Sequence, residues 1–388
     1  MLITRLKLKN WRNFKKIDVN LRERVYVIGP NASGKSNLLD VLRFLRDVAK
    51  PEGGGFQKAV KDRGGVTKLR CLLARRDTEI AIEIELAERV ETAPLWRYTL
   101  AFRSEGKGQQ RPLVSEEKVE NLRTAKVLLN RPDSKEDKND PERLTQTHLE
   151  QINTNHEFRE VADFFSSVTY LHLVPQLLKH AEELGGYRME DDPFGQAFLE
   201  RIAKTPERTS HSRLAKIEKV LQVCVPNMRK LRFYRDEITG KPHLEALYEH
   251  WRPDAGWQRE DQFSDGTLRL LGIMWSLLEG NSLLLLEEPE LSLNEDIVRQ
   301  IHRLIWTTQR QAKYRRQVFI TTHSEALLED KSIDPREVIR LEPTRDGTNA
   351  VESSKEDNDL IAAGYSIAET LLPKVKPDHV DQLSLFEV

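Results

Sequence analysis

The octapeptide Gly29–Ser36, GPNASGKS, constrains the fold of this chain more than any other stretch. It fits the pattern G-x-x-x-x-G-K-[ST] at every fixed position, and an alternating apolar segment, RVYVIG, leads into it. Apolar residues at helical spacing follow it, from Leu38 to Val48. A glycine-rich turn between a strand and a helix is the context that confirms a P-loop, whose backbone N–H groups close around phosphates. We therefore expect a nucleotide-binding domain and not a chance glycine-rich turn.

The residue types in this loop assign roles to its side chains. Lys35 would reach the β- and γ-phosphates of the nucleotide, and the Ser36 hydroxyl would ligate Mg²⁺. The expected nucleotide contacts are Gly29, Asn31, Ala32, Ser33, Gly34, Lys35, Ser36 and Asn37.

A second motif is an apolar run that ends in two carboxylates, SLLLLEEPE at residues 282–290. A buried parallel strand delivers its carboxyl end to the ligand crevice of an α/β sheet. Glu287 would hold Mg²⁺ directly or through water, although most P-loop enzymes have Asp in this position. Glu288 would orient or deprotonate the attacking water. The alternative interpretation is that both acids simply end a core strand and meet solvent.

A third motif, VFITTHS at residues 318–324, is another apolar strand that ends in polar side chains. His323 at its end could donate a hydrogen bond to the γ-phosphate, although a lone histidine is more often structural. The expected catalytic residues are therefore Lys35, Glu288 and His323.

Composition limits the class of protein. The formal net charge of −1 creates no overall field that attracts nucleic acid, so DNA would have to bind at a local patch. Two cysteines exclude a disulfide framework and fit a reducing compartment. The N-terminal segment lacks the apolar run of a signal peptide, and no stretch approaches the roughly 18 apolar residues of a membrane span. We expect a cytoplasmic protein without a membrane partner.

Patterning along the chain predicts four regions. Residues 1–123 form an N-terminal lobe with the P-loop and an antiparallel meander, built from alternating segments at 69–75, 79–88 and 95–103. Residues 124–235 form a mainly helical insertion, with a polar mobile loop at 130–143 and a strand at 168–174. Residues 236–372 form a C-terminal lobe in which helices and strands alternate, as in a parallel α/β sheet. Residues 373–388 form a tail.

Five motifs in order resemble one superfamily, the ABC-type ATPases of the SMC, RecF and OLD group. The segments that carry the resemblance are LKLKNWRNFKK, GPNASGKSNLLDVLRFL, FSDGTLRLLGIMWSLL, LLLLEEPELSLN and FITTHS. They look like its opening strand, P-loop, signature motif, Walker B with D-loop, and switch histidine. The resemblance implies an α/β ATPase head with a mostly parallel core sheet, an antiparallel β subdomain and a helical insertion. It also implies ATP and Mg²⁺ as cofactors.

The resemblance gives the signature segment FSDGT, at residues 263–267, a role in a second subunit. In this superfamily the signature motif closes over ATP that is held by the P-loop of the partner. Ser264 and Gly266 would then act in trans, and two ATPs would be enclosed in a homodimer. A helix N-terminus suits an anion, which agrees with this role. The alternative is an ordinary capping turn before a core helix.

Three further positions carry weaker expectations. Gln176, which follows a strand in LHLVPQLL, could be the glutamine that senses Mg²⁺, or a solvent-facing residue at a helix start. Asn294 occupies the D-loop position, where many relatives carry Asp or His. Arg12 could approach the nucleotide or be a surface arginine.

The expected function is an ATP-hydrolysing dimer that acts on or near DNA, in genome maintenance or phage defence, with a partner effector. Compact single-head ATPases of this kind are often found in bacterial defence or repair loci. A RecF-like repair clamp and an ATP-sensing subunit that controls a separate nuclease are the alternatives. The opening turn and the EEPE strand end argue against a transporter ATPase. The stretch between Ser36 and Ser264 has no sustained heptad and is too short for a long tether.

Two segments suggest partners. The run VPNMRKLRFYRDE clusters Arg229, Lys230, Arg232 and Arg235, with Lys204, Arg208 and Arg213 nearby in sequence, which fits either a DNA contact or a solvated face.

The tail ends in a pentapeptide, QLSLF, that looks like the peptide by which bacterial replication and repair proteins dock on the DNA polymerase sliding clamp. Its expected contacts are Gln382, Leu383, Leu385 and Phe386. The competing interpretation is that these apolar residues fold back onto the core of this protein.

Overall fold

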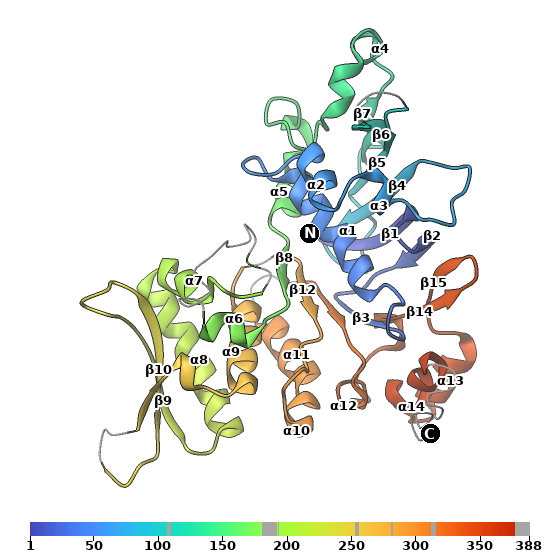
Figure 1. Cartoon of the computed structure of the whole chain (residues 1–388). Helices are drawn as coiled ribbons and strands as arrows, with labels where there is room; N and C mark the ends of the chain where they lie inside the picture. Colours follow the sequence, from blue (N-terminus) through green and yellow to red (C-terminus); the bar gives the residue numbers. More distant parts are fainter. Residues whose placement is uncertain are drawn as a thin grey trace, which may run out of the picture.

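The structure is a computed structural model that describes residues 1–106, 110–180, 192, 194–252, 256–280, 282–311 and 316–376. Figure 1 shows three β-sheets. One forms the N-terminal lobe, one lies at the centre with helices beside it, and a smaller one stands at the opposite end from the C-terminal helices. The pentapeptide at 382–386 lies outside the described residues, so the docking of the tail stays a prediction.

The N-terminal lobe is built on a six-stranded sheet in the order β2-β1-β4-β5-β6-β7, and all neighbouring strands in it are antiparallel. Its strands are β1 (Leu2–Trp11), β2 (Phe14–Asn20), β4 (Ile80–Ala87), β5 (Trp96–Ser104), β6 (Pro112–Asn121) and β7 (Lys126–Arg131). Alternating burial along β4 and β5 places one face of this sheet in a hydrophobic core. The predicted antiparallel subdomain is thereby confirmed.

The central sheet has six strands in the order β15-β14-β3-β13-β12-β8. Neighbours from β14 to β8 are parallel, and only β15 at the edge is antiparallel. Its strands are β3 (Arg24–Ile28), β8 (Thr169–Leu171), β12 (Leu284–Glu287), β13 (Val318–Thr321), β14 (Val338–Thr344) and β15 (Gly347–Val351). The mostly parallel core sheet is confirmed. The strands that carry the three sequence motifs, β3, β13 and β12, are direct neighbours in it.

Two hydrophobic cores lie on opposite faces of the central sheet, because side chains alternate along each strand. Val25 and Val27 pack in the core shared with α1 (Lys35–Ala49) and the N-terminal sheet. Tyr26 and Ile28 join the other core. The helices that supply residues to that second core include α8 (Glu207–Cys224), α9 (Asp265–Leu278), α11 (Ile301–Gln311) and α12 (Glu325–Leu328). The P-loop helix α1 is therefore held between two sheets.

The third sheet has the order β11-β10-β9 and is antiparallel. Its strands are β9 (Met228–Arg235), β10 (Pro242–Tyr248) and β11 (Trp257–Arg259). The other helices are α2 (Phe56–Asp62), α3 (Val66–Leu69), α4 (Lys135–Asn139), α5 (Arg159–Ser166), α6 (Pro175–Lys179), α7 (Phe198–Lys204), α10 (Glu295–Val298), α13 (Lys355–Ala362) and α14 (Ile367–Leu371). Short 3₁₀ turns, η1 to η5, are Pro141–Thr145, His156–Phe158, Glu260–Gln262, Pro335–Glu337 and Leu372–Val375.

Two local expectations were wrong. The segment 69–75 is not a meander strand, because Arg70 makes only an isolated bridge to Trp11 and Leu72 is largely exposed. The segment 130–143 is not an irregular loop: Ser134 caps α4, and Arg131 holds Asp137 of that helix by paired hydrogen bonds. The region expected to be mainly helical, residues 124–235, contains the helices α4 to α8 and also carries a strand at each end, β7 and β9. Its bounds as a domain stay a prediction. The strand within it is confirmed as β8.

No helix in the described ranges combines the length and apolar character needed to cross a membrane.

Candidate nucleotide site

The three motif strands place their polar ends at one edge of the central sheet. β3 leads into the P-loop, β12 ends at Glu287, and β13 ends next to Thr322 and His323. Parallel neighbours present their carboxyl ends on the same side, so these segments meet there. A cavity of about 780 Å³ opens at this edge. Its lining comes from the P-loop, the Walker B end, the switch segment and the C-terminal elements α14 and η5: Gly29, Pro30, Asn31, Glu288, Glu290, Leu291, Thr322, His323, Ser324, Glu325, Ala368, Glu369, Leu372, Pro373, Val375 and Lys376.

Asn13 holds the P-loop in place through side-chain hydrogen bonds. Sequence reasoning did not single out this residue. Its amide donates to the Ser33 carbonyl at 2.7 Å and to the Thr348 hydroxyl at 2.8 Å, and its Oδ1 accepts from the Asn37 amide at 2.8 Å. Gly34 has a φ of +98°, and a Cβ there would stand 2.2 Å from the Asn13 amide. Only glycine accommodates both the positive φ and this close approach. The loop conformation is therefore fixed before any nucleotide binds.

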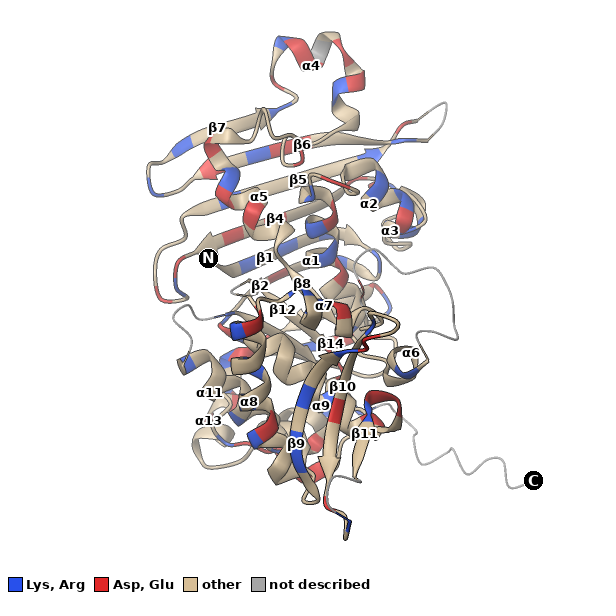
Figure 2. Ribbon diagram, turned by 90° about the vertical axis from the view of Figure 1, so that its left-hand side faces the viewer, with Lys and Arg blue, Asp and Glu red and all other residues tan. Residues whose placement is uncertain are grey.

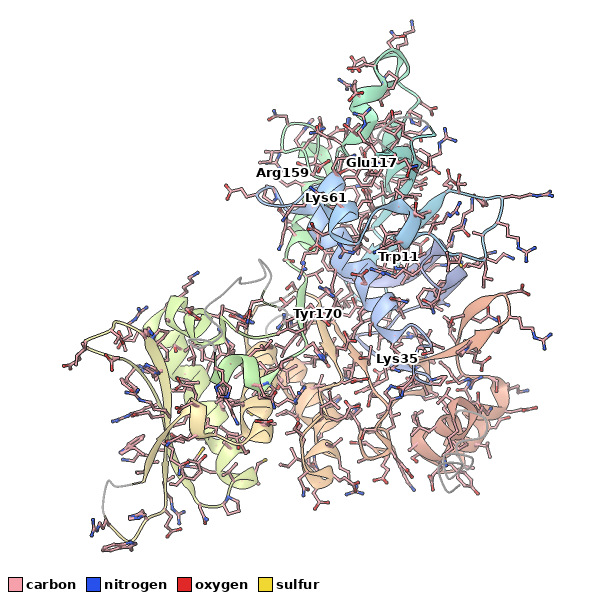
Figure 3. The ribbon with its side chains drawn as sticks, in the orientation of Figure 1. Trp11, Lys35, Lys61, Glu117, Arg159 and Tyr170 are labelled. Atoms are coloured by element: carbon pink, nitrogen blue, oxygen red, sulfur yellow. The ribbon has the colours of Figure 1, made fainter. Side chains whose placement is uncertain are left out.

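Lys35 begins α1, and its ammonium group folds into the loop. Nζ donates to the Gly29 carbonyl at 3.0 Å and the Pro30 carbonyl at 3.2 Å. Figure 3 labels Lys35. Burial lowers the pKa of Lys35, and the charges of Glu288 and Glu287 oppose that shift. A buried cation held by neutral carbonyls retains a strong attraction for an anion. This arrangement fits a triphosphate above the loop.

The expected metal ligands Ser36 and Glu287 are in direct contact: the Ser36 hydroxyl donates to Oε1 of Glu287. The other carboxylate oxygen, Oε2, accepts from the hydroxyl of Tyr170 on β8 at 2.5 Å (Figure 3 labels Tyr170). Hydroxyl and carboxylate oxygens are the ligands that Mg²⁺ prefers, with waters and phosphates completing its octahedron. The residues present therefore fit Mg²⁺. Sequence reasoning missed Tyr170, which belongs to the edge strand and to no motif.

The expected catalytic residues Glu288 and His323 also face one another. Nε2 of His323 lies 3.5 Å from Oε1 of Glu288. Glu288 has a φ of +44°, unusual for a residue that is not glycine, and its N–H donates to the Thr321 carbonyl at 3.1 Å. Strained backbone of this kind concentrates at functional sites. Burial and the charge of Lys35 lower the pKa of His323, which favours a neutral imidazole.

Glu290, the last acid of EEPE, is a second residue that sequence reasoning missed. Its Oε1 accepts from the Thr322 hydroxyl at 2.6 Å and from the His323 N–H at 3.2 Å. Its Oε2 is buried and accepts no hydrogen bond from the described residues. Glu290 therefore ties the switch segment to the Walker B end of β12.

The signature residues lie at the start of α9. Ser264 caps this helix, with its Oγ accepting from the Thr267 N–H at 3.1 Å, as the capping interpretation expected. Gly266 lets the helix approach the segment after Walker B, because a Cβ there would stand 2.6 Å from the Ser292 carbonyl. The role of both residues in a second subunit stays a prediction.

The remaining candidates make structural contacts. Gln176 donates to Asp265 of the signature segment at 2.5 Å, so its role as a Mg²⁺ ligand stays a prediction. Arg12 pairs with Asp40 at 2.7 Å, and Asn294 caps α10 through Asp296. In the P-loop, Asn31 and Ala32 are exposed, whereas the Ser33 side chain is fully buried, so Ser33 can offer only its backbone to a ligand.

A family model described as "AAA domain, putative AbiEii toxin, Type IV TA system" matches residues 25–329. Among curated proteins, the DNA replication and repair protein RecF of Roseiflexus castenholzii is 31% identical over 99 residues, which is 24% of this chain and 25% of that protein. RecF of Bacillus mycoides is 27% identical over 96 residues, covering 24% of this chain and 26% of the relative. The matched stretch thus spans about a quarter of these relatives.

A solved structure of the SmcHead bound to the C-winged helix domain of ScpA is similar in fold. Its TM-score is 0.57 at 13% sequence identity, and the alignment covers 92% of this chain and 99% of that one. At this identity the likeness concerns the fold alone. It agrees with the mostly parallel central sheet and the antiparallel N-terminal lobe described above.

Proposed function

The chain belongs to the AAA_21 family of AAA-domain proteins and resembles the P-loop ATPases of the SMC and RecF type, and we propose that it binds and hydrolyses ATP with Mg²⁺. One observation carries the proposal. Lys35, the Ser36–Glu287 pair and the Glu288–His323 pair gather at adjacent strand ends. Glu288 and His323 line the cavity there together with Gly29 of the P-loop. That set contains a phosphate cradle, oxygen ligands for a metal and a carboxylate positioned to act on water.

The residues divide the work as follows. Lys35 neutralises the β- and γ-phosphates, and Ser36 with Glu287 would hold Mg²⁺, which supplies charge neutralisation at the phosphates when bound. Glu288 accepts a proton from the attacking water or orients it. His323, in its neutral form, donates a hydrogen bond toward the γ-phosphate.

The direct test is hydrolysis by two single variants. Lys35→Ala should abolish activity through lost ATP binding. Glu288→Gln should retain ATP binding and lose about 10²–10⁴-fold in rate, which is the usual contribution of a positioned base. Nucleotide affinity and phosphate release, measured on the same samples, separate the two effects. Parental hydrolysis by the Gln variant would show that Glu288 is not the base.

We further propose that two copies enclose two ATPs, with Ser264 and Gly266 of one copy facing the nucleotide of the other. The support is the position of both residues in the first turn of α9, where backbone N–H groups suit an anion. Mixing Ser264→Arg with Lys35→Ala should restore part of the activity, because the heterodimer contains one intact composite site. No recovery in a heterodimer demonstrated by mass photometry would exclude shared sites.

The proposed setting is the cytoplasm, on or near DNA, in genome maintenance or phage defence with an effector such as a nuclease. The partial likeness to RecF and the family description support this setting. RecF-like clamping of DNA is the second candidate, favoured by the same match. Docking on the sliding clamp through Leu385 and Phe386 is part of the proposal. Capture with ATP-loaded Glu288→Gln protein, followed by identification of what co-elutes, distinguishes DNA from an effector protein.

A further inference from the structure

The outer face of the three-stranded sheet combines cationic and aromatic side chains. Strand alternation places Lys230, Arg232 and Tyr234 of β9 on one face, and the register brings Trp257 and Arg259 of β11 onto the same face. We call these five residues the stacking face. Figure 2 shows the basic bands along β9 on the side of the molecule turned toward the viewer.

These side chains are stacked on one another. The Arg232 guanidinium lies 3.9 Å from the centre of the Trp257 ring and 5.8 Å from that of Tyr234, and Arg259 lies 5.9 Å from Tyr234. Glu245 of β10 lies between the two arginines, at 2.6 Å from Arg232 and 4.0 Å from Arg259. Asp236, which directly follows β9, lies 3.7 Å from Arg259. Two carboxylates and three cations therefore lie on or beside this surface.

The opposite face of the sheet packs in the hydrophobic core. Leu231, Leu244 and Ala246 are buried there, and α7 and α8 pack against the sheet. Arg213 of α8 stacks on the Trp275 ring at 5.2 Å. The basic cluster expected from the sequence is therefore divided: Lys230 and Arg232 belong to the stacking face, whereas Lys204, Arg208 and Arg213 lie on the helices α7 and α8 that pack on the sheet.

Aromatic rings and guanidinium planes in an open sheet suit unpaired nucleobases, because every base has a π-face that can stack on them. Lys230 and the two arginines supply cations for the phosphates between those bases. Paired bases in a duplex are already stacked and cannot use such a platform. We propose that the stacking face binds single-stranded nucleic acid with little base preference.

The stacking face is also connected to the signature helix. Glu260 directly follows β11, is buried, and accepts from the Leu244 N–H at 2.8 Å, while its other oxygen lies 2.8 Å from Nδ1 of His243. The chain then reaches Ser264, the cap of α9. Glu260 fixes β10 to the turn that precedes the signature helix. Single-stranded nucleic acid bound on the stacking face would therefore change the position of Ser264. This step rests on the proposed function, and predicts that single strands change the ATPase rate.

The test is fluorescence anisotropy of labelled oligothymidylate with the full chain, at low and rising salt. Trp257→Ala should weaken binding about 5- to 150-fold, since stacking contributes about 1–3 kcal/mol per base. Lys230→Glu, which changes only an exposed side chain, should weaken binding and flatten the salt dependence. The matched control is Trp306→Ala on α11, where Arg310 stacks on the ring at 4.7 Å away from this sheet. It should bind as the parent does.

Several results would overturn the inference: no binding by the parent at low salt, equal losses from Trp306→Ala and Trp257→Ala, or equally tight binding of duplex DNA. Thermal melting of each variant separates loss of contact from loss of folding, and Lys230→Glu gives an independent reading if Trp257→Ala unfolds. The ATPase assay keeps the two proposals apart. If the protein hydrolyses ATP but binds no single-stranded nucleic acid, only this inference is wrong. If it binds single strands but hydrolyses no ATP, only the proposed ATPase activity is wrong.

Discussion

Two glutamate carboxylates in different lobes differ in how their oxygens are hydrogen-bonded: Glu117 is fully buried, and Glu290 is half-buried at the edge of the cavity. Glu117 in the N-terminal sheet has 0% exposure and accepts from the backbone N–H groups of His148 and Leu149 at 2.8 and 3.0 Å. Arg131 at 3.1 Å and the Tyr98 hydroxyl at 3.3 Å complete its partners. Glu290 beside the P-loop also has two donors, but both bond to one oxygen, and its Oε2 is buried without a partner among the described residues.

The difference lies in how completely the oxygens of each carboxylate are hydrogen-bonded. A fully satisfied network specifies one packing and rigidifies the lobe. An unsatisfied buried oxygen destabilises the fold, so its presence calls for an explanation such as a functional role. Burial raises the pKa of both carboxyls, and hydrogen bonds oppose that shift in each. We infer that the N-terminal sheet is a rigid support, whereas the segment Thr322–His323, which is bonded to Glu290, can move at a lower cost in free energy.

The largest expected effect lies in the satisfied network. Glu117→Ala leaves Arg131 buried without a full counter-charge, which should lower the free energy of unfolding by about 3–5 kcal/mol. Urea denaturation at pH 7 measures this loss. Glu120→Ala on the same strand is the control, because its partners Arg97 and Lys118 are partly exposed and the change should cost under about 1 kcal/mol. Equal losses in the free energy of unfolding from both variants would show that Glu117 stabilises the fold no more than a partly exposed carboxylate does.

An intermediate effect is expected from deleting the Glu290 acceptor. Glu290→Leu leaves the Thr322 hydroxyl and the His323 N–H without their partner, which should cost about 1–3 kcal/mol of stability. Because the same hydrogen bonds position His323, hydrolysis should fall while ATP affinity stays near that of the parent. Glu290→Gln keeps an acceptor oxygen and should retain most of the stability. Indistinguishable activity of the Leu and Gln variants would show that Glu290 does not position the histidine.

The smallest expected effect is a pH dependence. Since burial raises the pKa of Glu290, the folded state binds more protons than the unfolded state at pH values between the two pKa values. The stability of the parent therefore decreases as pH rises through that window, by about 1.4 kcal/mol for each unit of pKa difference. Glu290→Gln cannot titrate, so its stability relative to the parent should increase from pH 4.5 to 8. A constant difference across urea melts in this range would contradict the raised pKa.

Local patterns predicted much of the site. The P-loop needs a glycine at position 34 and a helix at Lys35, and both are visible in eight consecutive residues. The apolar runs before Glu287 and His323 identified buried parallel strands, because such strands lack the alternation of a half-exposed sheet. The failed expectation at 69–75 had alternating residues too, but Leu72 and Leu73 face outward while Leu69 is buried, which no pattern of a few residues reveals.

Other site residues had no local signal. Asn13 and Tyr170 reach the nucleotide site from the opening turn and from an edge strand, across long separations in sequence. The stacking face likewise needs Trp257 to return beside Arg232 through the register of three strands. A run of basic residues in the sequence does not show whether they form a binding face or an ordinary solvent-exposed face.

The sequence by itself determined the local motifs of this protein: a P-loop, two acids at a strand end, a histidine at the end of the next strand and a capped helix, each encoded within a few adjacent residues. Only the tertiary structure decided the strand order that places β13 between β3 and β12 and so brings residues of the P-loop, the acidic strand end and the histidine segment to one cavity. It also decided which glutamates are fully satisfied and which keep an unpaired oxygen. The physical reason is range: turn and capping preferences act between near neighbours in the chain, whereas burial and hydrogen-bond satisfaction depend on residues that only folding brings together.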